Sequence, residues 1–295
     1  MTAAAVRRRG RTDRGGRFIV PLLVVMGLTS IYPSLFSLYM SFYDWNWGER
    51  FNFVGLANYL ELLGSERFRT GLLNTFVFTI SAVTIELLLG LGIALAVHRL
   101  GWGAGMVRTL LLVPLMVSGI IVSMIWKIML DPTLGIVGYA AGLLGLPRLG
   151  FLGDPAMAMA SIVMIDTWWQ TAFVFIVLSA GLRALPEEPF EAAEVDGASA
   201  WQRFRYITLP LLRPVVLVVL LFRTIDCMKV FAIIFGTTGG GPLTTTESVQ
   251  VQAYRIAFKQ LNMSESMTMM VIFAVIVLGV VLVYQRLGAA RELVR

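Results

Sequence analysis

Long apolar stretches dominate this chain, and they constrain its fold more than any other feature. A helix needs about 20 mainly apolar residues to cross the hydrocarbon core of a bilayer. No water satisfies the backbone inside the bilayer, so continuous spanning segments of this kind must be helical. The sequence therefore predicts about six transmembrane helices, near residues 18–43, 72–97, 109–130, 156–182, 215–235 and 267–284.

The composition agrees with this prediction. Of 295 residues, 57% are hydrophobic and 14% are charged, whereas about a quarter of the residues in soluble domains are charged. Six spans leave no room for a separate soluble domain, which argues against catalysis on a large soluble substrate. With one cysteine, Cys227, and one histidine, His98, we expect neither an internal disulfide nor a Cys/His metal site. The prediction is an all-α polytopic membrane protein that is not an enzyme.

Lys and Arg predict the orientation, because these residues concentrate in cytoplasmic connections. If the N-terminus is cytoplasmic, most basic residues fall on the cytoplasmic side, including a cluster in the N-terminal tail: Arg7, Arg8, Arg9, Arg11, Arg14 and Arg17. We therefore expect both termini in the cytoplasm. The expected division is a basic tail at 1–17, a transmembrane domain at 18–285 and a second tail at 286–295. Pro33 and Pro114 fall within predicted spans and are expected to kink them, with a hinge in a gate as the alternative.

The cytoplasmic connection 183–213 differs from the other connections. Pro189 suits the first turn of a helix, and Gly197 suits a left-handed residue that ends it. Ser199 and Gln202 form a capping-box pattern for a second helix, which we expect to stop before Pro210. The sequence thus predicts a helix–turn–helix at the cytoplasmic face. Its large apolar side chains suit a groove in a protein partner, or they tie an amphipathic helix to lipid headgroups.

These residues match a known pattern. Glu191-Ala192-Ala193, three residues, Gly197, nine residues, Ile207, one residue and Leu209-Pro210 resemble in full the "EAA" loop of ABC importer permeases. The flanking EVDGASAWQRFRYITLP resembles most the carbohydrate-uptake branch, which includes the maltose and glycerol-phosphate permeases. YPSLFSLYMSF, FVGLANY and TTGGGP agree with that branch. The resemblance covers essentially the whole chain, to binding-protein-dependent transport system inner membrane components.

The resemblance implies a type I ABC importer permease fold in the bacterial cytoplasmic membrane. In that family the loop's short helix docks into a cleft of the ATPase subunit, whose closure on ATP drives alternating access. It implies coupling roles for residues of the loop: Glu191, Ala192, Ala193, Asp196, Gly197 and Trp201. It also implies as partners a second, non-identical permease, two ATPase subunits and an extracytoplasmic solute-binding protein.

Nucleotide binding is not expected in this chain. The pattern G-x-x-x-x-G-K-[ST] is absent, and the run Gly239-Gly240-Gly241-Pro242 has no lysine to reach a phosphate. That run is expected to be a flexible turn on the outside, with contact to the binding protein as the alternative. We expect no cofactor here, with ATP and Mg bound by the partner ATPase subunits, and no nucleic acid as a partner.

Polar residues within the predicted spans are candidates for the solute path, because such residues tend to face an interior cavity or to pair with one another. Arg223, Asp226 and Lys229 share one helix face and form either a structural ion-pair ladder or part of the path. Tryptophans and an amide suit a sugar, although tryptophans also anchor at interfaces. The full candidate set is Asn74, Glu86, Asp166, Trp168, Trp169, Gln170, Arg223, Asp226 and Lys229.

The expected solute is a mono- or oligosaccharide or a polyol. Glycerol-3-phosphate or a glycerophosphodiester is the first alternative, since an anionic solute would favour a path lined by Arg223 and Lys229. An ion-driven carrier or a membrane enzyme is the alternative from a different class. Asn74 either binds solute or holds helices together.

Overall fold

The computed structural model describes residues 14–46, 51–100, 103–145, 147 and 149–289, and it is helical apart from one short hairpin within those residues. Residues 1–13 of the expected N-terminal tail and residues 290–295 of the expected C-terminal tail lie outside the described residues, whereas 14–17 and 286–289 are helical. The elements, in order, are α1 (Arg14–Met26), η1 (Gly27–Ile31), α2 (Tyr32–Met40), β1 (Tyr43–Trp45), β2 (Phe51–Phe53), α3 (Ala57–Gly64), α4 (Glu66–His98), α5 (Ala104–Leu112), η2 (Pro114–Met116), α6 (Gly119–Met129), α7 (Ile136–Leu143), α8 (Ala158–Arg183), α9 (Glu188–Val195), α10 (Ala200–Arg203), η3 (Phe204–Thr208), α11 (Leu209–Met228), α12 (Ala232–Gly236), α13 (Val249–Phe258) and α14 (Met263–Ala289).

The prediction of about six membrane spans is confirmed. Five continuous helical stretches are long and apolar enough to cross a bilayer, and a bent pair adds a sixth. The continuous stretches are Ile19–Met40, Glu66–His98, Ala158–Arg183, Ala200–Met228 and Met263–Arg286. The bent pair joins Ala104–Met116 to Gly119–Met129 at an angle of 94°.

The third span was therefore wrongly expected to be one helix over 109–130. Pro114 has no backbone N–H to continue the helix, and it opens the short 3-10 turn η2, after which Val117 and Ser118 are extended. The indole Nε1 of Trp169 donates to the carbonyl oxygen of Val117 at 3.1 Å, which satisfies one backbone group at the break. Irregular backbone at membrane depth is tolerated where protein groups satisfy it in this way.

The fifth span also differs from the expectation of 215–235. It ends at Met228, and α12 follows as a separate short helix. At its N-terminal end the fifth span is continuous with the second helix of the 183–213 connection. That helix begins at Ala200 and does not stop before Pro210, where its end was expected. The π-helical turn η3 lies directly before Leu209 and Pro210, as η1 lies directly before Tyr32 and Pro33. A wide turn of this kind accommodates a proline ring without ending the helix.

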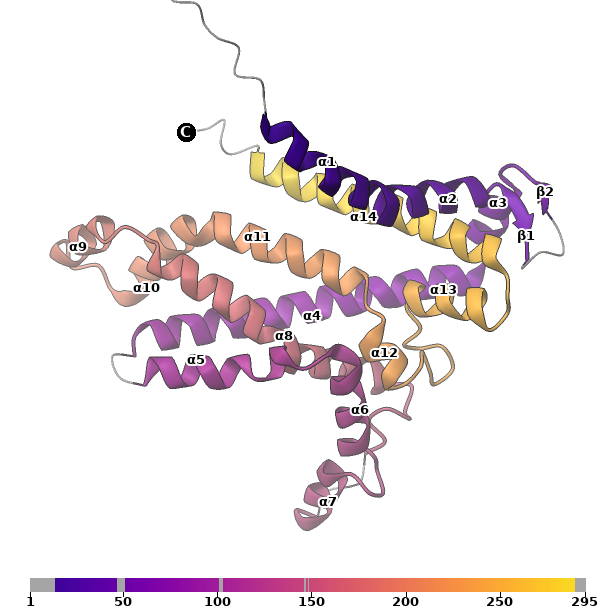
Figure 1. Ribbon diagram of the computed structural model, residues 1–295. Helices are drawn as coiled ribbons and strands as arrows, with labels where there is room; N and C mark the ends of the chain where they lie inside the picture. Colours follow the sequence, from indigo (N-terminus) through magenta and orange to yellow (C-terminus); the bar gives the residue numbers. More distant parts are fainter. Residues whose placement is uncertain (1–13, 47–50, 101–102, 146, 148, 290–295) are drawn as a thin grey trace, which may run out of the picture.

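Three helices, α4, α8 and α11, form the centre of the fold and lie side by side in Figure 1. Glycines let them approach closely, as small residues do between membrane helices. A Cβ on Gly90 of α4 would lie 2.6 Å from Cγ1 of Val174 on α8. A Cβ on Gly181 of α8 would lie 2.9 Å from side chains of both Leu212 and Val215 on α11.

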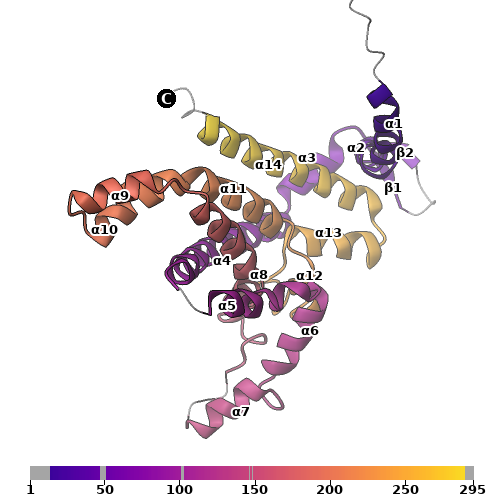
Figure 2. The same cartoon turned by 60° about the vertical axis from the view of Figure 1, so that its left-hand side comes forward.

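The segments that connect the long helices lie at two opposite ends of the molecule. Helices α9 and α10 project at one end, and the N-terminal end of α1 and the C-terminal end of α14 point the same way (Figure 1). The β1–β2 hairpin, paired Tyr43 with Phe53, lies at the other end. Figure 2 shows α6 and α7 projecting away from the central helices. The described ends of α1 and α14 thus lie toward the side of α9 and α10.

Candidate functional site

A buried arginine joins the three central helices. Arg223 of α11 is only 2% exposed. Its Nε donates to Oε2 of Glu86 on α4 at 2.6 Å, and its Nη2 donates to Oε1 of the same carboxylate at 2.9 Å. Nη2 also donates to Oδ2 of Asp166 on α8 at 2.8 Å, and Nη1 donates to Asp226 on α11. One guanidinium thus binds carboxylates from α4, α8 and α11.

The physical reason for this cluster is the cost of an unpaired charge. Glu86 is fully buried, and a charge of either sign at membrane depth needs a partner. Guanidinium offers five N–H donors in a fixed fork that matches carboxylate geometry. The pairing therefore fixes the relative positions of α4 and α11, because both oxygens of Glu86 are engaged at once.

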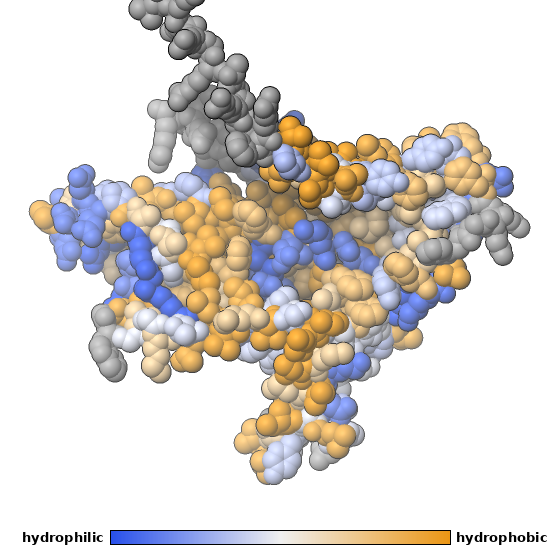
Figure 3. Space-filling view, viewed as in Figure 1, coloured by the Kyte–Doolittle hydropathy of each residue, from blue (hydrophilic) through white to orange (hydrophobic). Residues whose placement is uncertain are grey.

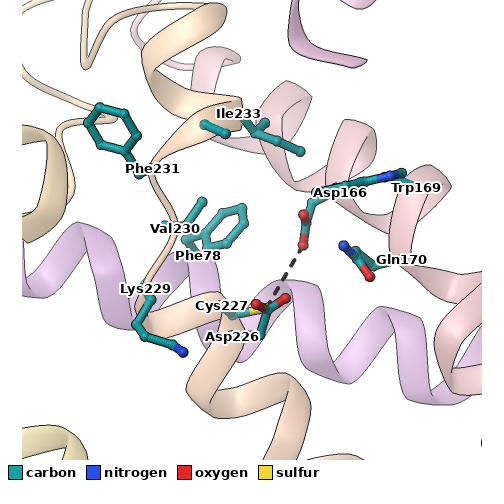
Figure 4. A pocket seen from close by; sticks show the side chains of 11 residues that line it. Phe78, Asp166, Trp169, Gln170, Asp226, Cys227, Lys229, Val230, Phe231 and Ile233 are labelled. Atoms are coloured by element: carbon teal, nitrogen blue, oxygen red, sulfur yellow. Dashed lines mark hydrogen bonds between the residues drawn. The ribbon is translucent and has the colours of Figure 1, made fainter. Parts of the chain in front are cut away.

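A cavity of about 280 Å³ opens beside this cluster. Figure 4 shows its wall, to which α8, the end of α11 and the segment leading into α12 all contribute. Five of the candidate residues line it: Asp166, Trp169, Gln170, Asp226 and Lys229. The remaining lining residues were not predicted from the sequence: Phe78, Cys227, Val230, Phe231, Ala232 and Ile233. The cavity thus combines aromatic rings, carboxylates, an amide and an ammonium group.

Neighbouring candidates on α8 point in different directions. Asp166, Trp169 and Gln170 share the face toward the cavity, since residues three and four apart lie on one side of a helix. Trp168 is 47% exposed and packs edge-on against Trp126 of α6, with ring centroids 5.5 Å apart. The structure therefore places Trp168 outside the cavity wall and Trp169 within it.

The face shared by Arg223, Asp226 and Lys229 is only partly an ion-pair ladder. Arg223 and Asp226 form a salt bridge. Within the described part of the chain, Lys229 joins neither residue in a salt bridge; it caps the end of α11 and lines the cavity. The side chain of Asp226 is 62% exposed, so it meets the cavity while bound to Arg223.

Glu86, Asp166 and Cys227 place potential metal ligands within 4.8 Å of one another. Arg223 donates to all three of them, including Sγ of Cys227 at 3.1 Å. The guanidinium cation therefore already occupies the position that a metal ion would need.

Asn74 lies away from the cavity and stabilises the connection between α12 and α13. Its Nδ2 donates to the carbonyl oxygens of Thr244 and Glu247 at 2.9 and 3.2 Å. The carboxylate of Glu247 is buried and accepts hydrogen bonds from Arg67 and Arg255. The sequence did not predict Glu247 as a functional residue, because one of its partners, Arg67, lies 180 positions away on α4, while Arg255 lies on α13.

The predicted turn between α9 and α10 is confirmed in detail. Pro189 lies in the first turn of α9, and Gly197 has a φ of +73°. The N–H of Ala198 donates to the carbonyl oxygen of Ala193 at 2.8 Å, which closes the helix end. The capping box of Ser199 and Gln202 is present. The chain therefore turns sharply at Gly197, and the next helix begins immediately.

This pair of helices carries exposed apolar side chains. Val195 is 89% exposed and Trp201 is 69% exposed. Figure 3 shows the pair as a largely hydrophilic projection with hydrophobic atoms at its edge. The ring of Trp201 also packs against that of Phe204, with centroids 5.5 Å apart, and most of the Trp201 side chain stays exposed.

Comparison with known proteins agrees with these features. The sequence model of the family described as binding-protein-dependent transport system inner membrane component matches residues 87–290. The trehalose/maltose transport system permease protein MalF of Thermococcus litoralis is 36% identical over 94% of both chains. The sn-glycerol-3-phosphate transport system permease protein UgpA of Agrobacterium fabrum is 32% identical over 88% of this chain and 89% of its own.

The fold has a solved counterpart. A chain from the crystal structure of a bacterial ABC transporter that imports the acidic polysaccharide alginate superposes with a TM-score of 0.83. It is 23% identical, and the match covers 93% of this chain and 94% of that one. Together with the six spans and the helix pair at Gly197, these matches show that this chain belongs to the family of binding-protein-dependent transport system inner membrane components, the permease subunits of ABC importers.

Proposed function

We propose that this chain forms half of a path through which a sugar crosses the cytoplasmic membrane by alternating access. The observation that carries the proposal is a polar cavity between spanning helices together with a helix pair built for docking at one end. A sugar suits the cavity because its ring packs on aromatic groups while its hydroxyls bond carboxylates and amides. In this proposal the solute contacts Asp166, Trp169, Gln170, Asp226 and Lys229.

The other candidates have supporting roles in this proposal. Glu86 and Arg223 hold α4, α8 and α11 in register around the cavity. Asn74 keeps the connection between α12 and α13 against α4. Trp168 packs on Trp126 and holds α6 against α8 from outside the cavity.

The energy for transport comes, in this proposal, from partner ATPase subunits that bind ATP and Mg, while this chain binds no cofactor. The docking element is the helix pair within 183–213. Glu191, Ala192 and Ala193 lie on α9, and Gly197 and Trp201 shape the turn and the start of the next helix. Asp196 caps the end of α9. Motion of a docked ATPase would reach the cavity directly, because α10, η3 and α11 form one continuous helix from Ala200 to Met228.

The relatives carry solutes of different charge. Two relatives are named for the transport of trehalose or maltose, which are neutral sugars. Another relative is named for the transport of glycerol-3-phosphate, which is an anion. Within our proposal the solute is a neutral mono- or oligosaccharide or a polyol. The remaining partners are a second permease and an extracytoplasmic binding protein.

Reconstitution tests this function. The chain is assembled with its partner permease, ATPase subunits and binding protein in proteoliposomes, and uptake of labelled trehalose or maltose is measured. ATP-dependent uptake that stops when the binding protein is left out supports the proposal. Uptake that persists without ATP and follows an ion gradient would overturn it.

A further inference from the structure

The charges around the cavity are unequal in sign. Among the described residues that line it, Asp166 and Asp226 are acidic and Lys229 is basic. Arg223 does not line the cavity, and its 2% exposure leaves no surface for a solute. Arg223, the cation that suggested a path for anions in the sequence, is therefore buried behind the cavity wall.

The nitrogen atoms of Arg223 are also fully engaged. Nε donates to Glu86, Nη1 donates to Asp226, and Nη2 donates to both Glu86 and Asp166. An incoming phosphate or carboxylate would have to displace one of these carboxylates and leave it unpaired in a buried site, which is costly. Arg223 thus acts on the wall of the cavity and not on the solute.

Arg223 shares its single charge among the carboxylates of Glu86, Asp166 and Asp226. Counted as formal charges, these three carboxylates stand against two cations, Arg223 and Lys229, which leaves one negative charge in excess beside the cavity. Asp226 has the larger effect on a solute, because its side chain is 62% exposed whereas that of Asp166 is 7% exposed. Charges that line a cavity with low-dielectric walls act more strongly than charges in water.

We infer that Asp226 is a specificity-determining residue, which gives the cavity a negative potential and excludes solutes that carry a phosphate or carboxylate. Its carboxylate accepts hydrogen bonds from sugar hydroxyls and repels anions by the same charge. This inference rests on the proposed function, since it assigns the solute class of the proposed path. It adds that discrimination by charge takes place in the membrane chain itself.

Charged thiol reagents measure this potential without any knowledge of the solute. Phe231→Cys places a thiol on the cavity wall of the assembled transporter, and it is labelled with cationic and anionic methanethiosulfonates of similar size. Both rates are divided by those of a free thiol in solution. The parent protein measures the background from Cys227, which is 2% exposed. We expect the cationic reagent to be favoured by about tenfold.

Two further variants in the Phe231→Cys background shift this preference in opposite directions. Asp226→Asn should lower the cation preference about tenfold, and Lys229→Gln should raise it by a similar factor. Asp154→Asn is the matched control, because Asp154 is exposed outside the cavity and its asparagine keeps the hydrogen bond to the N–H of Ala156. The control should leave the ratio unchanged.

The inference is overturned if Phe231→Cys shows no cation preference, or if Asp226→Asn and Lys229→Gln both leave the ratio where it was. Because Phe231→Cys and Lys229→Gln keep Asp226, these measurements remain decisive even if Asp226→Asn fails to assemble. Uptake of glycerol 3-phosphate by reconstituted transporter would also overturn the inference while leaving ATP-driven import intact. Absence of ATP-driven uptake of any solute would instead count against the proposed function.

Discussion

The guanidinium of Arg223 on α11 donates two hydrogen bonds to the carboxylate of Glu86 on α4, which lies 137 positions away in the sequence. Both residues are buried, so neither charge has water as an alternative partner. The pair therefore fixes the position of α4 relative to α11, although the two helices lie far apart in the sequence.

Replacement of Glu86 with glutamine should destabilise the assembled protein by about 1–3 kcal/mol, because it weakens the bidentate pair while Asp166 and Asp226 still bind Arg223. Thermal unfolding of the detergent-solubilised complex measures the change in stability. The matched control is Glu66→Gln at the exposed first turn of the same helix, which should cost less than about 1 kcal/mol. Equal losses of stability in both variants would contradict a stabilising role for the buried pair.

Gly197→Trp should separate ATP hydrolysis from transport. The residue has a φ of +73°, a conformation that side chains with a Cβ rarely adopt, so the turn between α9 and α10 must change. The expected result is ATPase activity that no longer supports solute uptake. Gly153→Trp on a loop at the other end, where nothing lies within 4 Å of an added Cβ, is the control. Normal uptake by Gly197→Trp would contradict the docking role.

Gly90→Ala should loosen the contact between α4 and α8. The added Cβ would lie 2.6 Å from Cγ1 of Val174, so the helices must move apart at a cost of about 1–3 kcal/mol. Val174→Ala in the same protein should recover part of the loss by making room. Gly92→Ala, where nothing lies within 4 Å, should be neutral or slightly stabilising. The measurement is the unfolding midpoint of each variant, and a lack of rescue by Val174→Ala would refute the steric explanation.

Acidification should loosen the turn after α6. The N–H of Leu134 lowers the pKa of the Asp131 carboxyl below its ordinary value, helped by the hydroxyl and N–H of Thr133. The carboxylate therefore stabilises the turn fully above its unfolded-state pKa, and this contribution is lost as pH falls through the lower folded-state pKa. Hydrogen exchange at the Leu134 amide, corrected for intrinsic rates, should accelerate over that range. Asp131→Asn should remove this pH dependence.

Much of this architecture is local and could be read from the sequence. Spans depend on the length of apolar runs, and the turn at Gly197 depends on residues within a few positions of it. Pro114 was visible as a kink, but the 94° bend was not. At that bend the indole of Trp169, which lies on another helix, donates to the carbonyl oxygen of Val117, and this contact between distant segments could not be read from the local sequence.

The sequence by itself determined which segments are apolar enough to span a membrane and where the turn at Gly197 falls, because hydropathy and helix caps act over short distances. Only the tertiary structure decided that Arg223 is hidden behind carboxylates and that Trp169 faces the cavity while Trp168 faces outward. Hydropathy does not record which face of a buried helix meets which neighbour. The partners of a buried charge are chosen by helix packing, which brings together residues far apart in the chain.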